Sequence, residues 1–179
     1  GEFCEDCKKI PHRFIRGRAL YEYASVQASI YRFKYAGRRE YAEFYGEEIA
    51  FWLGDFIRGI EPDALIPIPL HKKRLRKRGY NQAEVLAKKI SERTGVPTEA
   101  RKLVRIRNTK PLKLLNLAER QNNLKKAFIM EQNEVKLERV ILIDDIYTTG
   151  STVDTAACAL AEAGVKEIYF ITIACGTGV

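Results

Sequence analysis

The stretch from Val140 to Thr152 constrains the fold of this chain more than any other feature. It opens with four consecutive apolar residues, Val140 to Ile143, which is typical of a strand covered on both faces of a sheet. A helical pattern over residues 151–163 and a second apolar strand over residues 167–174 follow. Strand, helix and strand in succession predict a βαβ unit with parallel strands and a right-handed crossover. The predicted fold class is therefore α/β.

Two aspartates and a short polar loop come directly after this predicted strand. Ligands of parallel sheets bind beyond the carboxyl ends of the strands, which is where Asp144 and Asp145 are expected. Backbone N–H groups at the start of the next helix, together with its dipole, form a phosphate site. Because carboxylates accept hydrogen bonds from adjacent sugar hydroxyls, we expect a ribose phosphate here. Its 5′-phosphate would contact Thr148, Thr149, Gly150, Ser151 and Thr152.

Three other interpretations of this stretch compete with a ribose-phosphate site. A Walker B strand that holds Mg²⁺ requires a G-x-x-x-x-G-K-[ST] loop elsewhere in the chain. Gly54 and Gly59 have the spacing of the two glycines in that loop, but Ile60 stands where the lysine is required. Aspartates that merely cap the helix would leave an unusually long cap. A metal-dependent phosphatase site would leave the Thr-Thr-Gly-Ser-Thr loop without a role. The ribose-phosphate site is the interpretation we favour.

The rest of the pattern predicts further elements around the βαβ unit. The apolar run from Asp63 to Leu70 is closed by prolines and predicts a buried strand with a tight loop. The other predicted strands cover residues 19–25, 102–106 and 127–130, and the other predicted helices cover residues 26–35, 40–57, 81–93 and 117–124. We therefore expect a central, mostly parallel sheet flanked by helices over residues 19–179, after a small appendage over residues 1–18.

The net charge of +8 is concentrated in one block. Residues 71–126 contain 18 lysines and arginines against four acidic residues, a local balance of +14. Such a block attracts anions, either phosphorylated small molecules or nucleic acid. A basic surface that only keeps the protein in solution is the alternative.

Composition excludes several classes of protein. With 46% apolar residues in 179, the chain can bury a core, which excludes a disordered tail. No window approaches the ~18 uninterrupted apolar residues of a membrane helix, and the best one, Ile49 to Ile60, is broken by Asp55 and Arg58. Since no export signal is visible, we expect a cytoplasmic protein without membrane insertion.

The cysteines suggest a partial zinc site near the start of the chain. Cys4 and Cys7 have the C-x-x-C spacing of half a zinc knuckle, and His12 is the candidate for a third ligand. Because a closed site needs four ligands, a zinc-site remnant, no role and redox chemistry all stay open. Cys158 and Cys175 lie in apolar stretches and are expected to be core residues.

The residues 140–152 resemble the phosphoribosyl-pyrophosphate (PRPP) binding motif of the type I phosphoribosyltransferases. Within that superfamily, nearly the whole chain resembles the ComF (ComFC-like) family of bacterial DNA uptake. There are two departures: the family's N-terminal zinc module usually has two C-x-x-C pairs, and Leu112 stands where a glutamine is expected. The supporting blocks are Cys4 to Cys7, Lys34 to Arg38, Pro67 to Arg74, Arg78 to Ala83, Arg105 to Thr109, and Glu119 to Asn123 before Ala127 and Phe128.

The resemblance implies a role for each group of residues. Asp144 and Asp145 would bind the 2′- and 3′-hydroxyls, and the loop after them the 5′-phosphate. Mg²⁺, held mainly by the substrate's own oxygens, would offset the charge that grows on pyrophosphate. Cys4 and Cys7 would belong to a truncated zinc module. The residues expected near pyrophosphate are Leu70, His71, Lys72, Arg74, Arg78, Arg105 and Arg107.

These features give three functional hypotheses. The first is a Mg²⁺-dependent protein that binds PRPP or ribose 5-phosphate, in DNA uptake, and transfers or hydrolyses the phosphoribosyl group. The second is a competence factor that binds single-stranded DNA without catalysis, with tyrosines stacked on bases. The third is a PRPP-sensing regulator, which the lack of a helix-turn-helix pattern makes less favoured. The expected partners are PRPP or ribose 5-phosphate, single-stranded DNA and DNA-uptake proteins, with a homodimer left open.

Overall fold

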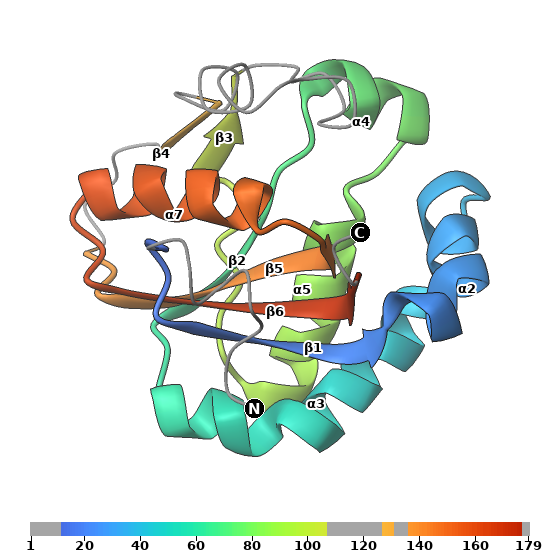
Figure 1. Ribbon diagram of the computed structural model, residues 1–179, viewed down its shortest axis with the longest axis horizontal. Coiled ribbons are helices and arrows are strands. Elements are labelled where there is room, and N and C mark those ends of the chain that lie inside the picture. The colour runs from blue at the N-terminus through green and yellow to red at the C-terminus, as the bar shows by residue number, and fades with distance from the viewer. Residues whose placement is uncertain (1–11, 107–126, 131–135, 177–179) are drawn as a thin grey trace.

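The core of the fold is a four-stranded parallel sheet. The computed structural model describes residues 12–106, 127–130 and 136–176. The strands are β1 (Arg16–Glu22), β2 (Ala64–Pro67), β5 (Arg139–Tyr147) and β6 (Glu167–Cys175), in the order β1-β6-β5-β2 (Figure 1). Every pairing within this sheet is parallel, which confirms the predicted α/β class.

Helices cover both faces of this sheet and separate two hydrophobic cores. On one face, α7 (Ser151–Glu162) packs beside a small antiparallel pair, β3 (Leu103–Arg105) and β4 (Phe128–Met130). On the other face lie α3 (Tyr41–Ile60) and α5 (Gln82–Thr94), with α2 (Tyr23–Tyr35) near the carboxyl ends of the strands (Figure 1). The run from Val140 to Ile143 is fully buried between these layers, as its composition predicts.

Local signals in the sequence explain where α5 begins and ends. The side chain of Asn81 accepts a hydrogen bond from the backbone N–H of Ala83 at 3.2 Å, which caps the first turn. Gly95 then ends the helix in the left-handed conformation, with a φ of 77°. Both features match the prediction of a helix that stops near this glycine.

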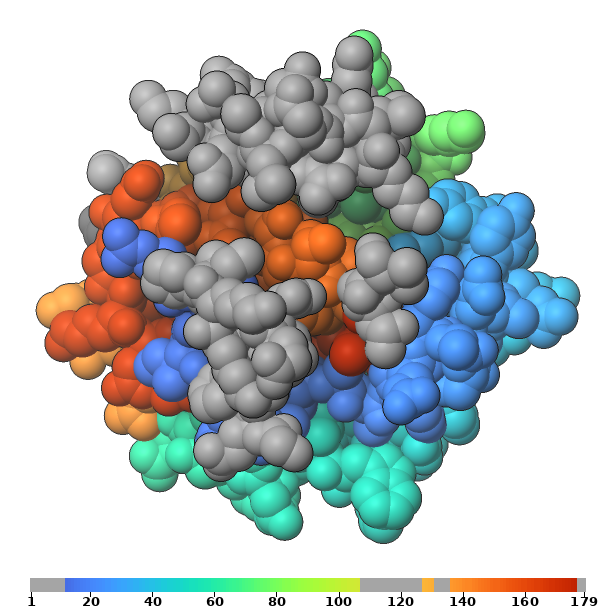
Figure 2. Space-filling view, in the orientation of Figure 1, coloured from blue at the N-terminus to red at the C-terminus, as the bar shows by residue number. Residues whose placement is uncertain are grey.

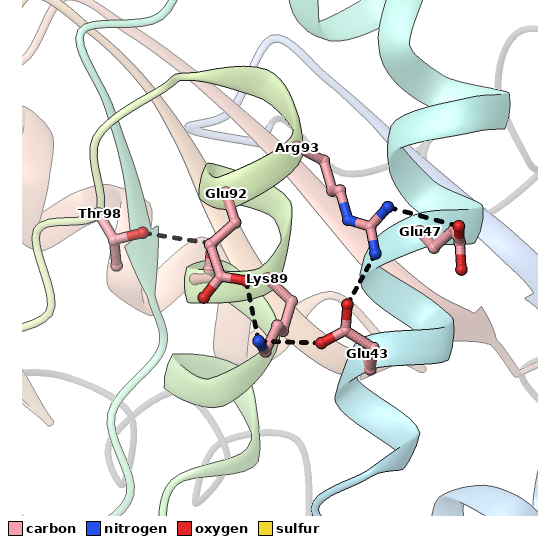
Figure 3. A network of polar contacts seen from close by, with 7 residues as sticks. Glu43, Glu47, Lys89, Glu92, Arg93 and Thr98 are labelled. Carbon is pink, nitrogen blue, oxygen red and sulfur yellow. Dashed lines mark hydrogen bonds and ion pairs between the residues drawn. The ribbon is translucent and has the colours of Figure 1, made fainter.

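Ion pairs on the outer surface join α5 to α3. Lys89 and Arg93 of α5 both bind the carboxylate of Glu43, at 2.9 and 2.7 Å (Figure 3). Lys89 also binds Glu92 at 2.8 Å, and Arg93 also contacts Glu47. Part of the basic block found in the sequence is therefore already neutralised by acidic side chains of the same chain.

The first strand differs from its prediction. We expected a strand over residues 19–25, whereas β1 covers Arg16–Glu22 and Tyr23 begins α2. The physical reason is the partner strand, because Glu22 lies opposite Cys175, where β6 ends. β1 thus starts inside the segment assigned to the appendage, and the division at residue 18 stays a prediction.

Other boundaries also differ from those expected. The strand predicted from Asp63 to Leu70 is shorter and covers only Ala64–Pro67, whereas β5 continues past the aspartates to Tyr147. The helix α4 (Lys72–Arg78) was not predicted. Its sequence holds six cations and a single apolar residue, so it shows no amphipathic period. The helix predicted over residues 117–124 lies outside the described residues.

Candidate ribose-phosphate site

The two aspartates lie where one neighbouring strand has already ended. β2 pairs with β5 only as far as Ile143, while β6 continues beside β5, with Thr172 opposite Asp144. Asp145 is 4% exposed. Because side chains alternate along a strand, Asp144 faces the α7 side and Asp145 faces the side of α5 and α2. The prediction that both acids lie at the carboxyl end of the sheet is confirmed, because they follow the last residue of β5 that pairs with β2.

Asp145 is held by side chains from two helices. Its Oδ2 atom lies 2.7 Å from Nζ of Lys34 in α2 and accepts a hydrogen bond from Nε2 of Gln82 in α5 at 3.0 Å. The Oε1 atom of the same Gln82 amide accepts a hydrogen bond from the guanidinium of Arg78. Burial, the largest single cause, lowers the pKa of Lys34, but the charge and hydrogen bond of Asp145, together with the charge of Asp144, raise it above its ordinary value. Lys34 therefore stays a cation.

Asp144 has the opposite electrostatic situation. Its Oδ1 atom accepts a hydrogen bond from the backbone N–H of Asp145 at 2.8 Å. Burial first, and the charge of Asp145 second, raise the pKa of the Asp144 carboxyl to about 8, although Lys34 pulls it downward. Asp144 is thus the acid whose charge is least favourable in this site.

The predicted phosphate loop turns into α7 at Gly150. This residue has a φ of 74° and precedes the helix, and no side chain caps the first turn. Thr148 and Thr149 are exposed, and the hydroxyls of Thr149 and Ser151 lie 2.8 Å apart. In Figure 2 the orange atoms of the β5–α7 segment reach the surface between the blue atoms of α2 and the red-orange atoms of α7. Backbone N–H groups of the α7 start are the groups suited to an anion here.

The ring of Tyr147 forms the floor of this loop. It stacks on Phe170 with the ring centroids 4.7 Å apart, and Phe14 packs edge-on against it. A Cβ atom at Gly150 would lie 2.5 Å from the hydroxyl oxygen of Tyr147. Glycine at this position therefore satisfies both the backbone conformation and the close approach of the ring.

The cations predicted near pyrophosphate divide into two groups. Arg74 and Arg105 lie near each other on the side of Asp144, since burial, followed by the charge of Arg74, lowers the pKa of Arg105 while Asp144 opposes the shift. Arg78 belongs to the Asp145 side, through Gln82, and its guanidinium lies over the ring of Tyr35 at 5.1 Å.

The remaining residues of that set are placed less closely to the acids. His71 caps α4, because its Nδ1 atom accepts a hydrogen bond from the N–H of Lys73 at 3.3 Å. Lys72 is exposed in the first turn of that helix, and Leu70 is half-buried just ahead of it. Arg107 lies outside the described residues.

Of the candidate zinc ligands, only His12 belongs to the described residues. Cys4 and Cys7 lie outside the described residues, and His12 binds Asp154 of α7 through Nδ1 at 2.5 Å. The thiols of Cys158 and Cys175, which were expected in the core, are half-buried. Among residues 12–106, 127–130 and 136–176, no three His, Cys, Asp or Glu side chains gather as a metal cage.

Lys34 and Gln82 are the site residues that the residue-level reasoning missed. A signal for them was present, because each lies in one of the blocks that carry the resemblance, Lys34 to Arg38 and Arg78 to Ala83. What the blocks lack is any local indication that both side chains meet at Asp145.

Comparison with known proteins decides the family. Residues 46–176 match the phosphoribosyl transferase domain, a range that holds β2, β5, β6 and the loop into α7. The chain belongs to this family. As a phosphoribosyl transferase domain it has the fold that the resemblance to type I enzymes implied. Lys34 lies ahead of the matched range.

Relatives within the family are proteins of competence and DNA utilization. Competence protein F of Haemophilus influenzae is 38% identical over 109 residues, which are 60% of this chain and 48% of that protein. Competence protein ComFC of Bacillus subtilis is 30% identical over 171 residues, or 90% of this chain and 67% of that protein. DNA utilization protein YhgH of Escherichia coli O157:H7 is 28% identical over 169 residues, or 92% and 74%.

These comparisons confirm the resemblance to the ComF family. The matched part spans about half the length of Competence protein F. Within the described part of this phosphoribosyl transferase domain, none of the helices combines the length and the apolar character that crossing a membrane requires.

Proposed function

We propose that this domain binds the ribose 5-phosphate part of PRPP, with Mg²⁺, in a protein of DNA uptake. Asp144 and Asp145 accept hydrogen bonds from the 2′- and 3′-hydroxyls, and the residues from Thr148 to Thr152 bind the 5′-phosphate. The observation that carries this proposal is the succession of two acids at the carboxyl end of the parallel sheet and an uncapped helix start led by Gly150.

Pyrophosphate would lie on the side of the cations. Arg105 of β3 lies near Asp144 and Arg74 of α4 lies near Arg105, and we assign both to the phosphates that leave the sugar. Bound Mg²⁺ supplies positive charge that offsets the charge developing there. The reaction class that such a site serves is transfer or hydrolysis of the phosphoribosyl group.

Calorimetry with PRPP at millimolar Mg²⁺ tests the proposal directly. The parent chain is expected to bind PRPP and ribose 5-phosphate, and a variant with both Asp144→Asn and Asp145→Asn is expected to lose both while its circular dichroism stays that of a folded chain. A parent that binds neither ligand would reject the proposal, and so would a double variant that binds as tightly as the parent.

A second candidate function is the binding of single-stranded DNA on α4 and α2. Its support is a set of exposed cations on α4 that form no ion pair with any described residue, in contrast to the paired cations of α5: Lys72, Lys73, Arg76 and Lys77. Of the tyrosines expected to stack on bases, Tyr31 and Tyr35 are exposed, and their ring centroids lie 5.1 Å apart. Tyr80 is buried. Oligonucleotide binding that weakens steeply as salt rises is the expected result, and no binding at low salt would exclude it.

A further inference from the structure

Lys34 differs from the other ion-paired lysines of the described residues in its burial. Its side chain is 18% exposed, whereas those of Lys88, Lys89, Lys136 and Lys166 are 30–76% exposed. It comes from α2, an element outside the matched domain range, and reaches the acid at the centre of the site. A buried ion pair costs desolvation energy and is weak evidence of stabilisation alone, so its position calls for a reason beyond packing.

The contacts of Asp145 show what this lysine does to the carboxylate. Both donors, Nζ of Lys34 and Nε2 of Gln82, bind the same oxygen, Oδ2. Oδ1 takes part in neither of these two contacts. Because Oδ2 is held from two helices, the orientation of the carboxylate is defined, and Oδ1 is the atom left for a ligand hydroxyl.

The charges around the acid pair make Lys34 the counter-ion on the Asp145 side. Two neighbouring carboxylates disfavour each other's ionisation. On the α7 face the cations are Arg105 and, near it, Arg74, and on the α2 face they are Lys34 and Arg78, of which Arg78 binds Gln82. Without Lys34, Asp145 would keep, of its two side-chain donors, only the neutral amide of Gln82.

We propose that Lys34 is a positioning residue of the ribose-phosphate site. Its ammonium group binds Oδ2 of Asp145 and fixes the orientation of the carboxylate, so that Oδ1 accepts a hydrogen bond from one hydroxyl of the ribose diol. This inference rests on the proposed function. It makes α2 part of the sugar site, although the residues that contact the sugar are on β5.

Two substitutions at this position and one matched control test the inference. Lys34→Met removes the charge and keeps the length, and Lys34→Arg keeps the charge. Lys166→Met breaks a solvent-exposed lysine–glutamate pair, with Glu138, far from the acids, at the opposite ends of β5 and β6. Calorimetry measures the affinity of each variant for ribose 5-phosphate and, separately, for inorganic phosphate, which contacts only the loop.

The expected loss is specific to the sugar. Lys34→Met weakens ribose 5-phosphate roughly tenfold to a hundredfold, the range for hydrogen bonds to charged groups, while inorganic phosphate changes by less than about threefold. Lys34→Arg recovers most of the affinity, and Lys166→Met leaves both ligands unchanged. If the two ligands weaken equally, or if Lys34→Met binds ribose 5-phosphate like the parent, the inference is wrong.

The outcomes also separate this inference from the proposed function. A parent chain that binds no ribose 5-phosphate overturns the proposed function itself, whatever Lys34 does. A double-mutant cycle covers the case in which Lys34→Met folds poorly, because Lys34→Met with Asp145→Asn removes both buried charges together. In the Asp145→Asn background, Lys34→Met is expected to cause no further loss of ribose 5-phosphate affinity, and a further tenfold loss would overturn the inference.

Discussion

Asp144 and Asp145 are neighbours in the chain, yet Lys34 affects the two carboxyl groups differently. Asp145 has Lys34 as a counter-ion at 2.7 Å, while at Asp144 burial and the charge of Asp145 outweigh the pull of Lys34 and raise the pKa to about 8. The same substitution at the two positions is therefore expected to affect stability in opposite directions.

Asp144→Asn is expected to raise the melting temperature, and Asp145→Asn to lower it. The first removes a carboxylate whose ionisation burial disfavours, and the second leaves Lys34 without its partner, at a cost of about 1–3 kcal/mol. For a chain of this size, each kcal/mol corresponds to about 2–4 °C. Differential scanning calorimetry of the two single variants is the measurement. Equal shifts of the same sign would contradict the arrangement on two faces.

The pH dependence of stability follows from the raised pKa of Asp144. A carboxyl whose folded pKa lies above its unfolded value binds more protons when folded, so its contribution to stability falls as the pH rises. The window runs from the ordinary value of 3.8 to about 8. The advantage of Asp144→Asn over the parent is thus expected to grow from about pH 5 to about pH 8. An advantage that stays constant over this range would show that Asp144 titrates normally.

Gly150→Ala is expected to damage both the loop and its phosphate site. Alanine at a φ of 74° is strained by about 1–2 kcal/mol, and its Cβ would also displace the ring of Tyr147 from Phe170. Urea unfolding and ribose 5-phosphate binding are both expected to weaken. Gly59→Ala is the matched control, because it lies inside α3 with no atom within 4 Å of the new Cβ and gains about 0.5–1 kcal/mol of helix propensity. Unchanged ribose 5-phosphate affinity in Gly150→Ala would argue against this loop as the phosphate site.

Charge removal on α4 and on α5 is expected to affect DNA binding differently. Glutamine at the four unpaired cations of α4 lowers the salt dependence of oligonucleotide binding by up to about 3 in the slope of log affinity against log salt. Glutamine at Lys88, Lys89 and Arg93 leaves it unchanged, because their charges are already paired with glutamates. Fluorescence anisotropy over a salt series measures both sets. A larger change in salt dependence from the α5 substitutions would place the DNA interface on α5 and not on α4.

The parts of the fold that could be predicted are those coded by contiguous residues. β5, the loop, α7 and β6 follow one another in the sequence, and each has its own signal: a buried apolar run, a polar turn, and a helix that ends before Gly164. The positions of the polar loop and of both aspartates could be predicted for the same reason.

The parts that could not be predicted depend on contacts between distant segments. Lys34 and Gln82 meet at Asp145 only because α2 and α5 pack on the same face of the sheet. The end of β1 is set by the end of its partner β6. The helix α4 has no apolar stripe, and its caps, His71 and Gly79, were the only local signs of it.

The strand order also has a consequence for how the chain is made. In the sheet β1 pairs with β6 and β2 pairs with β5, so both early strands find these partners only after the last third of the chain has been made. Until then the apolar faces of α3 and α5 have no complete sheet to pack against. Such distant pairing slows folding and leaves the nascent polypeptide open to aggregation. We therefore expect the central sheet to form only after β5 and β6 have been made.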